Sequence, residues 1–417
     1  MKNIFVSLGV VSFLMACTPT EKQPEIRSLS VDELAVAVTP QENREYSYTD
    51  KKAGFWYGRT HQDEPTDWYA GWNLAKKRIF SDYVLSVDGK PLVRQEAEVT
   101  VLPDCLTRRW KNAQEQLQLV DDYELLCIRL SDIQGDSISL MMNETLLKDA
   151  VKKADALCYT PVEAEGKVLK VVPWVAQGIA FDGNTMKAPK SAEGFLIACG
   201  TEAHCDSLVT LFRQQGKELL AARKARMNNL IQVNNPLHTN LLELDKALAW
   251  ITLTMDELIT EQQGKGIYAG LPWFNEYWGR DMFIAMPGAT LVTGQFDYTK
   301  EILKDFAKLQ DTDTTSVTCG RVPNRANLEG ILYNTTDGTP RYVMEAEELL
   351  KYSGDQSFLK DIYPSVVLSI DQSIRHHIDD KGYLLHEDAD TWMDVKRNGI
   401  PGSPRGNRAN DIQYLWH

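Results

Sequence analysis

One stretch of the chain has the composition of a proton-donating site. It reads Thr391-Trp392-Met393-Asp394, and it places a carboxyl group next to an indole. An apolar neighbour and partial burial disfavour the charged form of a carboxyl group, which suits a general acid. Asp394 is therefore the candidate acid. Glu387, Asp388 and Asp390 compete for this role, although their closeness in the sequence is typical of a solvated acidic loop.

A second stretch, residues 269–281, has residue types that bind hydroxyl groups. Its aromatic residues offer flat apolar faces, and Arg280 and Asp281 place a donor fork beside two acceptor oxygens, which vicinal hydroxyls require. The candidate binding residues here are Trp273, Trp278, Arg280 and Asp281. The alternative is that the aromatics belong to the core and that Arg280 and Asp281 form a structural ion pair.

Two further short segments carry polar residues in turn-rich surroundings. The first is Pro323-Asn324-Arg325, and the second is Tyr333-Asn334-Thr335-Thr336-Asp337. Alone, they predict no more than a loop whose Asp337 caps a helix. Arg405, which follows the candidate acid in Pro404-Arg405-Gly406, is a further polar candidate.

Together these segments resemble the amylo-α-1,6-glucosidase domain of glycogen debranching enzymes, within the wider group of glucoamylase-like glycosidases. The resemblance rests on Gly-x-Pro-Trp-Phe leading to Trp-Gly-Arg-Asp, on Pro-Asn-Arg with Tyr-Asn-Thr-x-Asp, and on Thr-Trp-Met-Asp followed by Pro-Arg. All three motifs stand in this order within residues 270–405. The resemblance covers roughly residues 236–417, and it is only weak in the first half of the chain.

The resemblance implies an (α/α)6 toroid whose funnel holds a glucose unit. Arg280 and Asp281 are then expected to hold hydroxyls of the terminal glucose, while Asp394 protonates the leaving oxygen. The other residues implied to bind substrate are Trp273, Trp278, Asn324, Arg325, Asp337, Trp392 and Arg405. Family members invert configuration, which needs a second carboxylate as base. In them this base is a Glu beyond the position that matches His417, so we expect the 417-residue sequence to lack it.

The elements that position these loops are predicted to be helices in residues 236–417. Apolar residues recur at spacings of three and four from Leu241 to Leu258, which indicates an amphipathic helix ended by Gly264. Further helices are expected after an Asp297 cap, from Thr339 and Pro340 to Gly354, and from Pro364 with Val367, Ile370, Ile374 and Ile378 on one face. No strand pattern is evident between them, so this half is predicted to be all-helical and to form the first part of the toroid.

The first half has a different pattern, with short apolar runs separated by turn residues. Residues 42–205 are predicted to form a β-sandwich, and the clearest hairpin joins residues 83–87 to residues 90–93 through Asp88-Gly89. Residues 206–235 have a helix-forming composition and are expected to link this domain to residues 236–417. The fold class is therefore a multidomain β plus α chain.

The N-terminus resembles a bacterial lipoprotein signal. Lys2 precedes an apolar run that is too short to span a bilayer, and the run ends in Leu14-Met15-Ala16-Cys17. We expect residues 1–17 to be the signal peptide, Cys17 to be lipidated and residues 18–41 to form a tether. The protein is then anchored in the bacterial cell envelope, on the periplasmic face or the outer surface. The alternative is an ordinary signal peptide with an incidental cysteine.

Composition excludes several classes of protein. Hydrophobic residues make up 43% and charged residues 25%, which is typical of a globular protein. The net charge of −13 argues against nucleic acid as a partner. No zinc-type spacing of Cys and His is present, and we expect no cofactor and no metal. Six cysteines after Cys17 allow 15 disulfide pairings, which the sequence does not decide, although Cys199 and Cys205 are close enough to close a small loop.

The sequence therefore predicts a lipid-anchored glycoside hydrolase that releases glucose from the branches or ends of an α-glucan or its oligosaccharides. One alternative is a related glucoamylase-like hydrolase of another small α-glycoside, such as trehalose. Another alternative, of a different class, is a non-catalytic surface lipoprotein that binds glycans.

Overall fold

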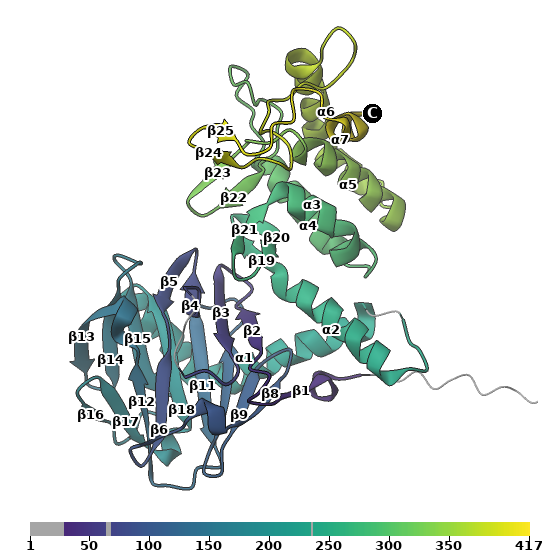
Figure 1. Cartoon of the computed structure of the whole chain (residues 1–417). Helices are drawn as coiled ribbons and strands as arrows, with labels where there is room; N and C mark the ends of the chain where they lie inside the picture. Colours follow the sequence, from purple (N-terminus) through teal and green to yellow (C-terminus); the bar gives the residue numbers. More distant parts are fainter. Residues whose placement is uncertain (1–28, 64–67, 235–236) are drawn as a thin grey trace, which may run out of the picture.

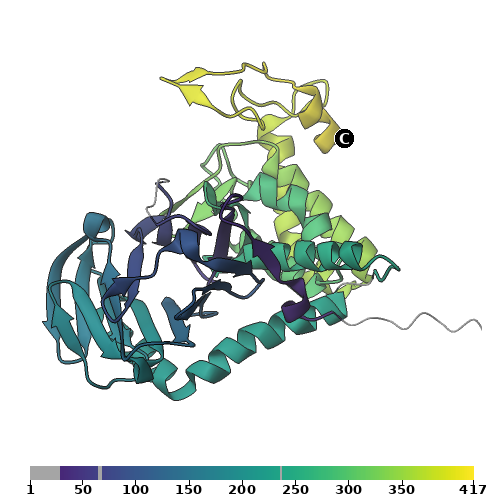
Figure 2. The same ribbon diagram turned by 60° about the horizontal axis from the view of Figure 1, so that its bottom comes forward.

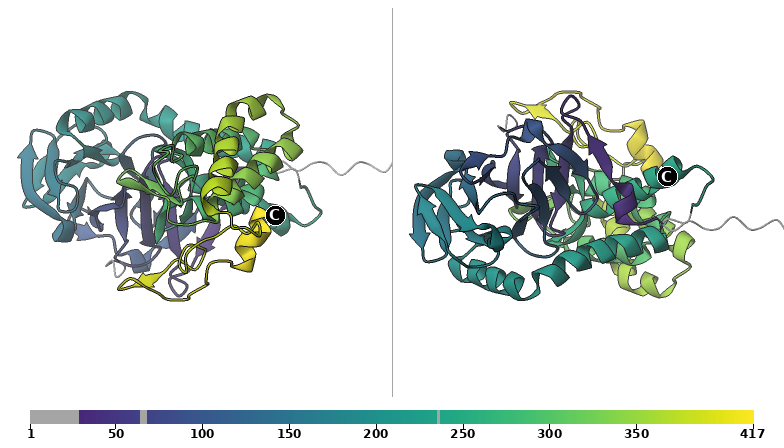
Figure 3. Two further views of the ribbon diagram at one scale, coloured as in Figure 1. Left: turned by 90° about the horizontal axis from the view of Figure 1, so that it is seen from above. Right: turned by 90° about the horizontal axis from the view of Figure 1, so that it is seen from below.

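The computed structural model describes residues 29–63, 68–234 and 237–417. The predicted signal peptide, Cys17 and most of the predicted tether lie outside these residues. A strand-rich first half and a helix-rich second half lie side by side (Figure 3). Among the described residues, no helix combines the length and the apolar character that crossing a bilayer requires.

The first half is built on a nine-stranded antiparallel sheet. Its strand order is β1-β8-β9-β10-β11-β18-β15-β14-β13. In chain order its strands are β1 (Val36–Val38), β8 (Glu98–Val101), β9 (Leu106–Arg109), β10 (Gln114–Leu119), β11 (Leu125–Ser131), β13 (Leu147–Lys153), β14 (Ala156–Pro161), β15 (Val168–Pro173) and β18 (Gly194–Gly200). Strand β1 pairs with β8 although its residues were placed in the predicted tether.

Two smaller antiparallel sheets share the core of this half. One has the order β2-β3-β4-β5 and the other β16-β17-β12-β6-β7. Their strands are β2 (Glu45–Thr49), β3 (Gly54–Arg59), β4 (Gly71–Leu74), β5 (Lys77–Phe80), β6 (Tyr83–Val87), β7 (Lys90–Pro91), β12 (Ser137–Met142), β16 (Ala180–Asp182) and β17 (Thr185–Pro189). Trp72, Leu117 and Leu140, one from each sheet, are fully buried in a single hydrophobic cluster. The predicted antiparallel β region is therefore confirmed.

The predicted hairpin and the helical connector are also present. Strands β6 and β7 flank Asp88 (φ 48°) and Gly89 (φ 76°), a turn that requires positive φ at both positions. Helix α1 (Glu202–Asn234) packs Leu208 and Phe212 against the nine-stranded sheet. From there it runs toward the second half (Figure 2).

The second half contains the predicted helices, but its all-helical character was wrong. The helices are α2 (Leu242–Leu258), α3 (Gly279–Met286), α4 (Phe296–Lys308), α5 (Gly338–Ser353), α6 (Ser357–His377) and α7 (Asn410–Trp416). A five-stranded sheet lies among them (Figure 1), made of β19 (Ile259–Gln262), β20 (Gly264–Gly270), β21 (Phe274–Trp278), β22 (Arg325–Asn327) and β23 (Gly330–Leu332). Gly264, taken as a helix stop, instead has φ 81° at the turn between β19 and β20. A hairpin of β24 (Lys396–Arg397) and β25 (Ile400–Pro401) follows near the C-terminus.

Helix boundaries differ from the prediction where Pro and Thr were read as starts. Helix α5 begins at Gly338 with Asp337 at its N-cap, two residues before the predicted cap, and it ends at Gly354 as predicted. Pro364 lies inside α6 rather than at its start. Asp297 lies in the first turn of α4, whose N-cap is Gln295.

Two of these helices expose part of their predicted apolar faces, although Met255 and Leu258 of α2 pack against the hydrophobic core of the second half. On α2 the buried residues are Asp245, Ala249, Thr252, Leu253 and Asp256, whereas Leu244 and Ile251 are exposed. On α6 the buried face carries Ser365, Ser369 and Gln372, whereas Ile370 and Ile374 are exposed. The side chain of Gln310 explains the polar face of α6, because it bonds Ser365 O at 3.0 Å and Ser369 Oγ at 2.8 Å. Periodicity predicted the helices but not the faces that they bury.

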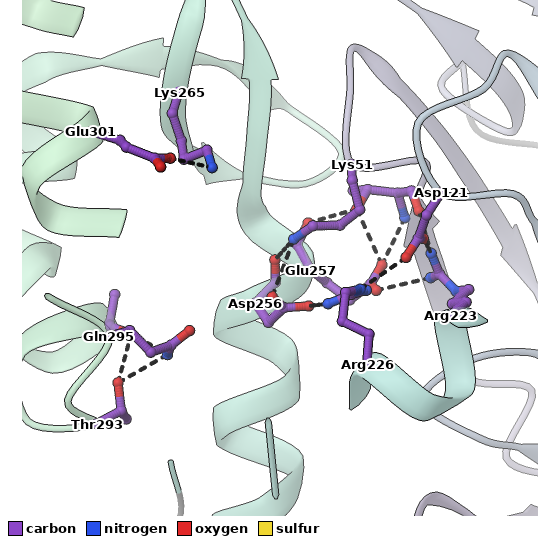
Figure 4. A network of polar contacts seen from close by, with 12 residues as sticks. Lys51, Asp121, Arg223, Arg226, Asp256, Glu257, Lys265, Thr293, Gln295 and Glu301 are labelled. Atoms are coloured by element: carbon purple, nitrogen blue, oxygen red, sulfur yellow. Dashed lines mark hydrogen bonds and ion pairs between the residues drawn. The ribbon is translucent and has the colours of Figure 1, made fainter. Parts of the chain in front are cut away.

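A buried ionic network joins the two halves, and we call it the junction cluster. It consists of Lys51, Asp121, Arg223, Arg226, Asp256 and Glu257 (Figure 4). Arg223 bonds Glu257 at 2.8 Å, and Arg226 bonds Asp121 at 2.9 Å. Burial opposes ionisation of Asp256, but Lys51 and Arg226 more than offset it and lower its pKa.

The six described cysteines are buried free thiols, so Cys199 and Cys205 are not joined. Burial raises the pKa of Cys105, Cys199 and Cys205 to about 12, which keeps these thiols protonated and poorly nucleophilic.

Candidate active site

The centre of the candidate site is the guanidinium of Arg280, in the first turn of α3. Strand β21 ends at Trp278, and Gly279 then turns the chain into the helix. The Gly279 amide donates to Asn324 O at 2.7 Å, and a Cβ at this position would lie 2.3 Å from Pro323 O. Only glycine fits this close approach. The contact therefore fixes where Arg280 leaves the strand.

Three carboxylates face this guanidinium: Asp281 from α3 itself, Asp337 from the N-cap of α5, and Asp394 from the loop before β24. Asp394 Oδ2 lies 3.4 Å from Nη1, Asp337 Oδ2 lies 3.8 Å from Nη1, and Asp281 Oδ2 lies 3.6 Å from Nε. Nη1 also donates to the backbone oxygen of Thr391 at 3.2 Å. We call Arg280, Asp281, Asp337 and Asp394 the site cluster. One positive group against three negative groups leaves an excess of acceptor oxygens.

The three carboxylates differ in exposure, and this separates what they can do. The Asp281 side chain is 47% exposed, that of Asp394 19%, and that of Asp337 only 4%. Burial raises the pKa of Asp337, partly offset by Arg280, and its Oδ1 has no hydrogen-bond partner in the described protein. Asp281 and Asp394 are therefore the two that a ligand can reach.

A second buried ion pair holds two of the motif loops together. Arg321 Nη2 lies 3.3 Å from Asp390 Oδ2, and Thr336 Oγ1 donates to the same oxygen at 2.7 Å. The Thr336 amide also donates to Asp390 O at 2.8 Å. We call the contacts of Arg321, Asp390 and Thr336 the brace. Because Asp337 follows Thr336 and Asp394 lies four residues after Asp390, the brace holds both carboxylates beside Arg280. Arg321 was not identified from the sequence, since no local pattern marks its distant partner.

The competitors of Asp394 are engaged elsewhere. Asp390 belongs to the brace just described, and Asp388 Oδ1 accepts from the Gly406 amide at 2.6 Å. Glu387 is exposed and lines a separate polar depression with Asp388 and Lys396. Of the four acidic candidates, only Asp394 lies beside Arg280 in the described part of the chain.

The predicted aromatic residues are divided between different places. Trp278 is half-buried, with the edge of Phe274 at 6.4 Å and the Arg325 guanidinium 5.9 Å from its ring. Trp392 is 56% exposed, and Arg405 lies 6.0 Å from its ring while bonding Asp411 at 2.7 Å. These contacts place both rings beside basic side chains of the motif loops.

Two of the predicted substrate-binding residues, Trp273 and Asn324, make their contacts elsewhere. Trp273 is 60% exposed and lines a groove of about 330 Å³ with Tyr57 and Trp250, between β2 and α2. It makes no described contact with Arg280. Asn324 is buried and supports the start of β22, since its amide donates to Leu332 O at 2.8 Å and its Nδ2 to Asn334 at 3.2 Å.

Among the described residues, no group of three or more His, Cys, Asp or Glu side chains could hold a metal ion.

Sequence comparison assigns this part of the chain to a family. Residues 229–417 match the family described as amylo-alpha-1,6-glucosidase, and this stretch contains every residue of the site cluster. The matched stretch includes the five-stranded sheet and helices α2 to α7.

Comparison with solved structures found a weaker similarity. A bacterial glucoamylase, solved in complex with acarbose, is similar with a TM-score of 0.43 and 10% identity. The match covers 78% of this chain and 52% of that chain, so this chain spans about half the length of the glucoamylase. No curated protein matches the chain.

Proposed function

We propose that the whole protein is an inverting glycoside hydrolase that releases glucose from the branches or ends of an α-glucan. The observation that carries the proposal is the convergence of three motif loops on Arg280, within a domain of the amylo-alpha-1,6-glucosidase family. A guanidinium with surplus carboxylate oxygens supplies both donors and acceptors for sugar hydroxyls. The partners of this site are then α-glucan oligosaccharides.

The proposed mechanism gives each exposed group a separate task. Arg280 and Asp281 hold hydroxyls of the terminal glucose, while protonated Asp394 donates its proton to the glycosidic oxygen as the C–O bond breaks. A water molecule then attacks the anomeric carbon from the opposite face. Its proton goes to a second carboxylate, about 6.5–9.5 Å from the first in inverting enzymes. We assign no residue of residues 1–417 to that role.

We also propose that helices α2 to α6 belong to an (α/α)6 toroid. Its support is the pair of apolar stripes left open on α2 and α6, represented by Ile251 at 59% and Ile374 at 54% exposure. Stripes of this kind normally pack against another element. Further helices of a closed ring would cover both of them. The N-terminal lipid anchor at Cys17, and with it the cell-envelope location, also remain proposals.

The test is product analysis with the longest natural form of the protein. The substrates are a maltodextrin with α-1,6 branches, a linear maltooligosaccharide and trehalose, and the anomer of the released glucose is followed by NMR. We expect β-glucose first, with the branched or linear glucan preferred. Preference for trehalose would favour the related hydrolase, and saturable glucan binding without glucose release would favour the glycan-binding lipoprotein.

A further inference from the structure

The turn between β4 and β5 reaches from the strand-rich half to the strand that precedes Arg280 (Figure 1). Lys76 Nζ lies 2.7 Å from Glu276 Oε1, in the middle of β21. The Glu276 side chain is 8% exposed and that of Lys76 is 32% exposed. A buried carboxylate needs such a partner, because burial without one is costly.

The backbone of this turn is unusual for its residue types. Leu74 pairs with Lys77, so Ala75 and Lys76 form a two-residue hairpin loop, with φ 49° and φ 69°. Loops of this type favour Asn-Gly, since residues with a Cβ rarely adopt positive φ. Ala75 and Lys76 hold this strained conformation, and it presents the Lys76 ammonium to Glu276. Strain of this kind often marks a position with a specific task.

Glu276 in turn connects β21 to β22. The same Oε1 accepts from Asn327 Nδ2 and lies 3.8 Å from Arg325 Nε. Asn327 and Arg325 are the two ends of β22, whose Arg325 pairs with Trp278. Trp278 is the residue before Gly279, where the chain turns to place Arg280.

From these contacts we propose that Lys76 of the N-terminal β region is a positioning residue of the glycosidase site, acting through Glu276 on the β21–β22 strand pair that sets Trp278 and Arg280. The expected effect of Lys76 on catalysis rests on the proposed function. It assigns to the first half of the chain a role in the site that is otherwise formed by residues 229–417.

The neighbouring Lys77 provides a matched control. Its Nζ lies 3.2 Å from Glu329 Oε1, so it also links the turn to the β22–β23 hairpin. Both partners are about half exposed, at 49% and 50%, and exposed pairs of this kind contribute little. Loss of Lys77 therefore removes the same charge and a contact with the same five-stranded sheet, without taking a partner from a buried group.

The experiment compares Lys76→Met, Lys76→Arg and Lys77→Met in the full-length protein. We expect Lys76→Met to lower kcat for glucose release about tenfold to hundredfold, since small misplacements in a site have effects of this size. Lys76→Arg should restore most of the rate, and Lys77→Met should leave it within about twofold, as for exposed pairs. Amide hydrogen exchange in residues 274–278 and 325–327 should become severalfold faster in Lys76→Met alone.

The exchange measurement separates this inference from the proposed function. If the wild-type protein releases no glucose, the proposed function fails, and exchange still decides whether Lys76 orders β21. Lys76→Met behaving like Lys77→Met in exchange, or changing exchange without changing kcat in an active enzyme, overturns the inference. Should Lys76→Met fail to fold, the single variant Glu276→Gln is compared with the double variant Glu276→Gln plus Lys76→Met. Once Glu276 is neutral, removing the lysine should have little further effect on kcat or on exchange. A large further loss in the double variant contradicts the proposal.

Discussion

The junction cluster and the site cluster use the same residue types, but their charges are arranged differently. In the junction cluster three basic groups meet three carboxylates, and their ion pairs include contacts at 2.8 and 2.9 Å. In the site cluster one guanidinium meets three carboxylates at 3.4 to 3.8 Å. The first is balanced and closed, and the second has surplus acceptors and looser contacts.

This difference separates a structural role from a binding role. Charges removed from water need partners of opposite sign, and every charged group of the junction cluster has one among the other members. The site cluster leaves Asp281 and Asp394 partly open, so hydroxyl groups of a ligand can complete it. Substitutions in the first should therefore act on stability, and substitutions in the second should act on activity.

The largest expected effect on stability is that of Arg223→Met. Arg223 is fully buried and bonds Thr49 O at 3.0 Å as well as Glu257. Its removal leaves the Glu257 carboxylate without a cationic partner and the Asp121 carboxylate with Arg226 alone, which we expect to lower the free energy of unfolding by about 3–5 kcal/mol. Urea denaturation measures this. Lys224→Met on the same helix, which loses a partly exposed pair with Asp32, is the control and should change stability by less than about 1 kcal/mol.

Arg280→Met should reduce activity more than stability. We expect kcat/KM for glucan hydrolysis to fall about 10²–10³-fold, because a preorganised donor at the reacting sugar is lost. The midpoint of thermal unfolding should fall less than in Arg223→Met, because Asp281 and Asp394 remain open to water and the Arg321–Asp390 pair still holds the loops. Arg408→Met, which removes the pair between a half-exposed arginine and Asp379, is the control. Loss of folding without a selective loss of activity would place Arg280 with the junction residues.

A pH-dependent effect on stability is expected for Asp50, beside the junction cluster. Burial raises the pKa of Asp50 to about 8, and the nearby Glu124 and Asp121 add to this, against two backbone hydrogen bonds from Lys52 and Gly54. A folded-state pKa above the unfolded value of 3.8 means that stability is highest below about pH 4 and is lost as pH rises toward 8.

Asp50→Asn keeps an acceptor for the two amides but removes the titration. Relative to wild type, its stability should therefore improve by up to about 1.4 kcal/mol for each pH unit between pH 4 and 8. Denaturant titrations of both proteins across this range give the difference directly. A difference that does not change with pH would show that Asp50 is ionised in the folded protein.

The sequence predicted where most helices and strands lie better than it predicted which of their faces are buried. Short apolar runs and turn residues located β6, β7, β12 and β15, because local backbone preferences decide such strands. The strands β19 to β21 were missed, because their alternation is interrupted by Gly264, Gly266 and Gly270. The buried faces of α2 and α6 were wrong, because long-range polar partners such as Arg226 for Asp256 override the apolar stripe.

For the site, local motifs predicted which residues gather but not what holds them. Arg280, Asp337 and Asp394 were identified and lie together. Trp273 was expected in the same place but lines the groove beside β2. Arg321 and Lys76 escaped notice because their partners, Asp390 and Glu276, are distant in sequence, and single residues in loops carry no periodic signal.

The most direct test of the account concerns the proton donated by Asp394. In the full-length protein, Asp394→Asn should lower glucose release from a branched maltodextrin about 10²–10⁴-fold, the usual range for loss of a general acid. α-Glucosyl fluoride needs no proton on its leaving group, so the same variant should hydrolyse it at a rate close to that of wild type. Equal losses on both substrates, or near-normal release from the maltodextrin, would contradict the assignment of Asp394 as the acid.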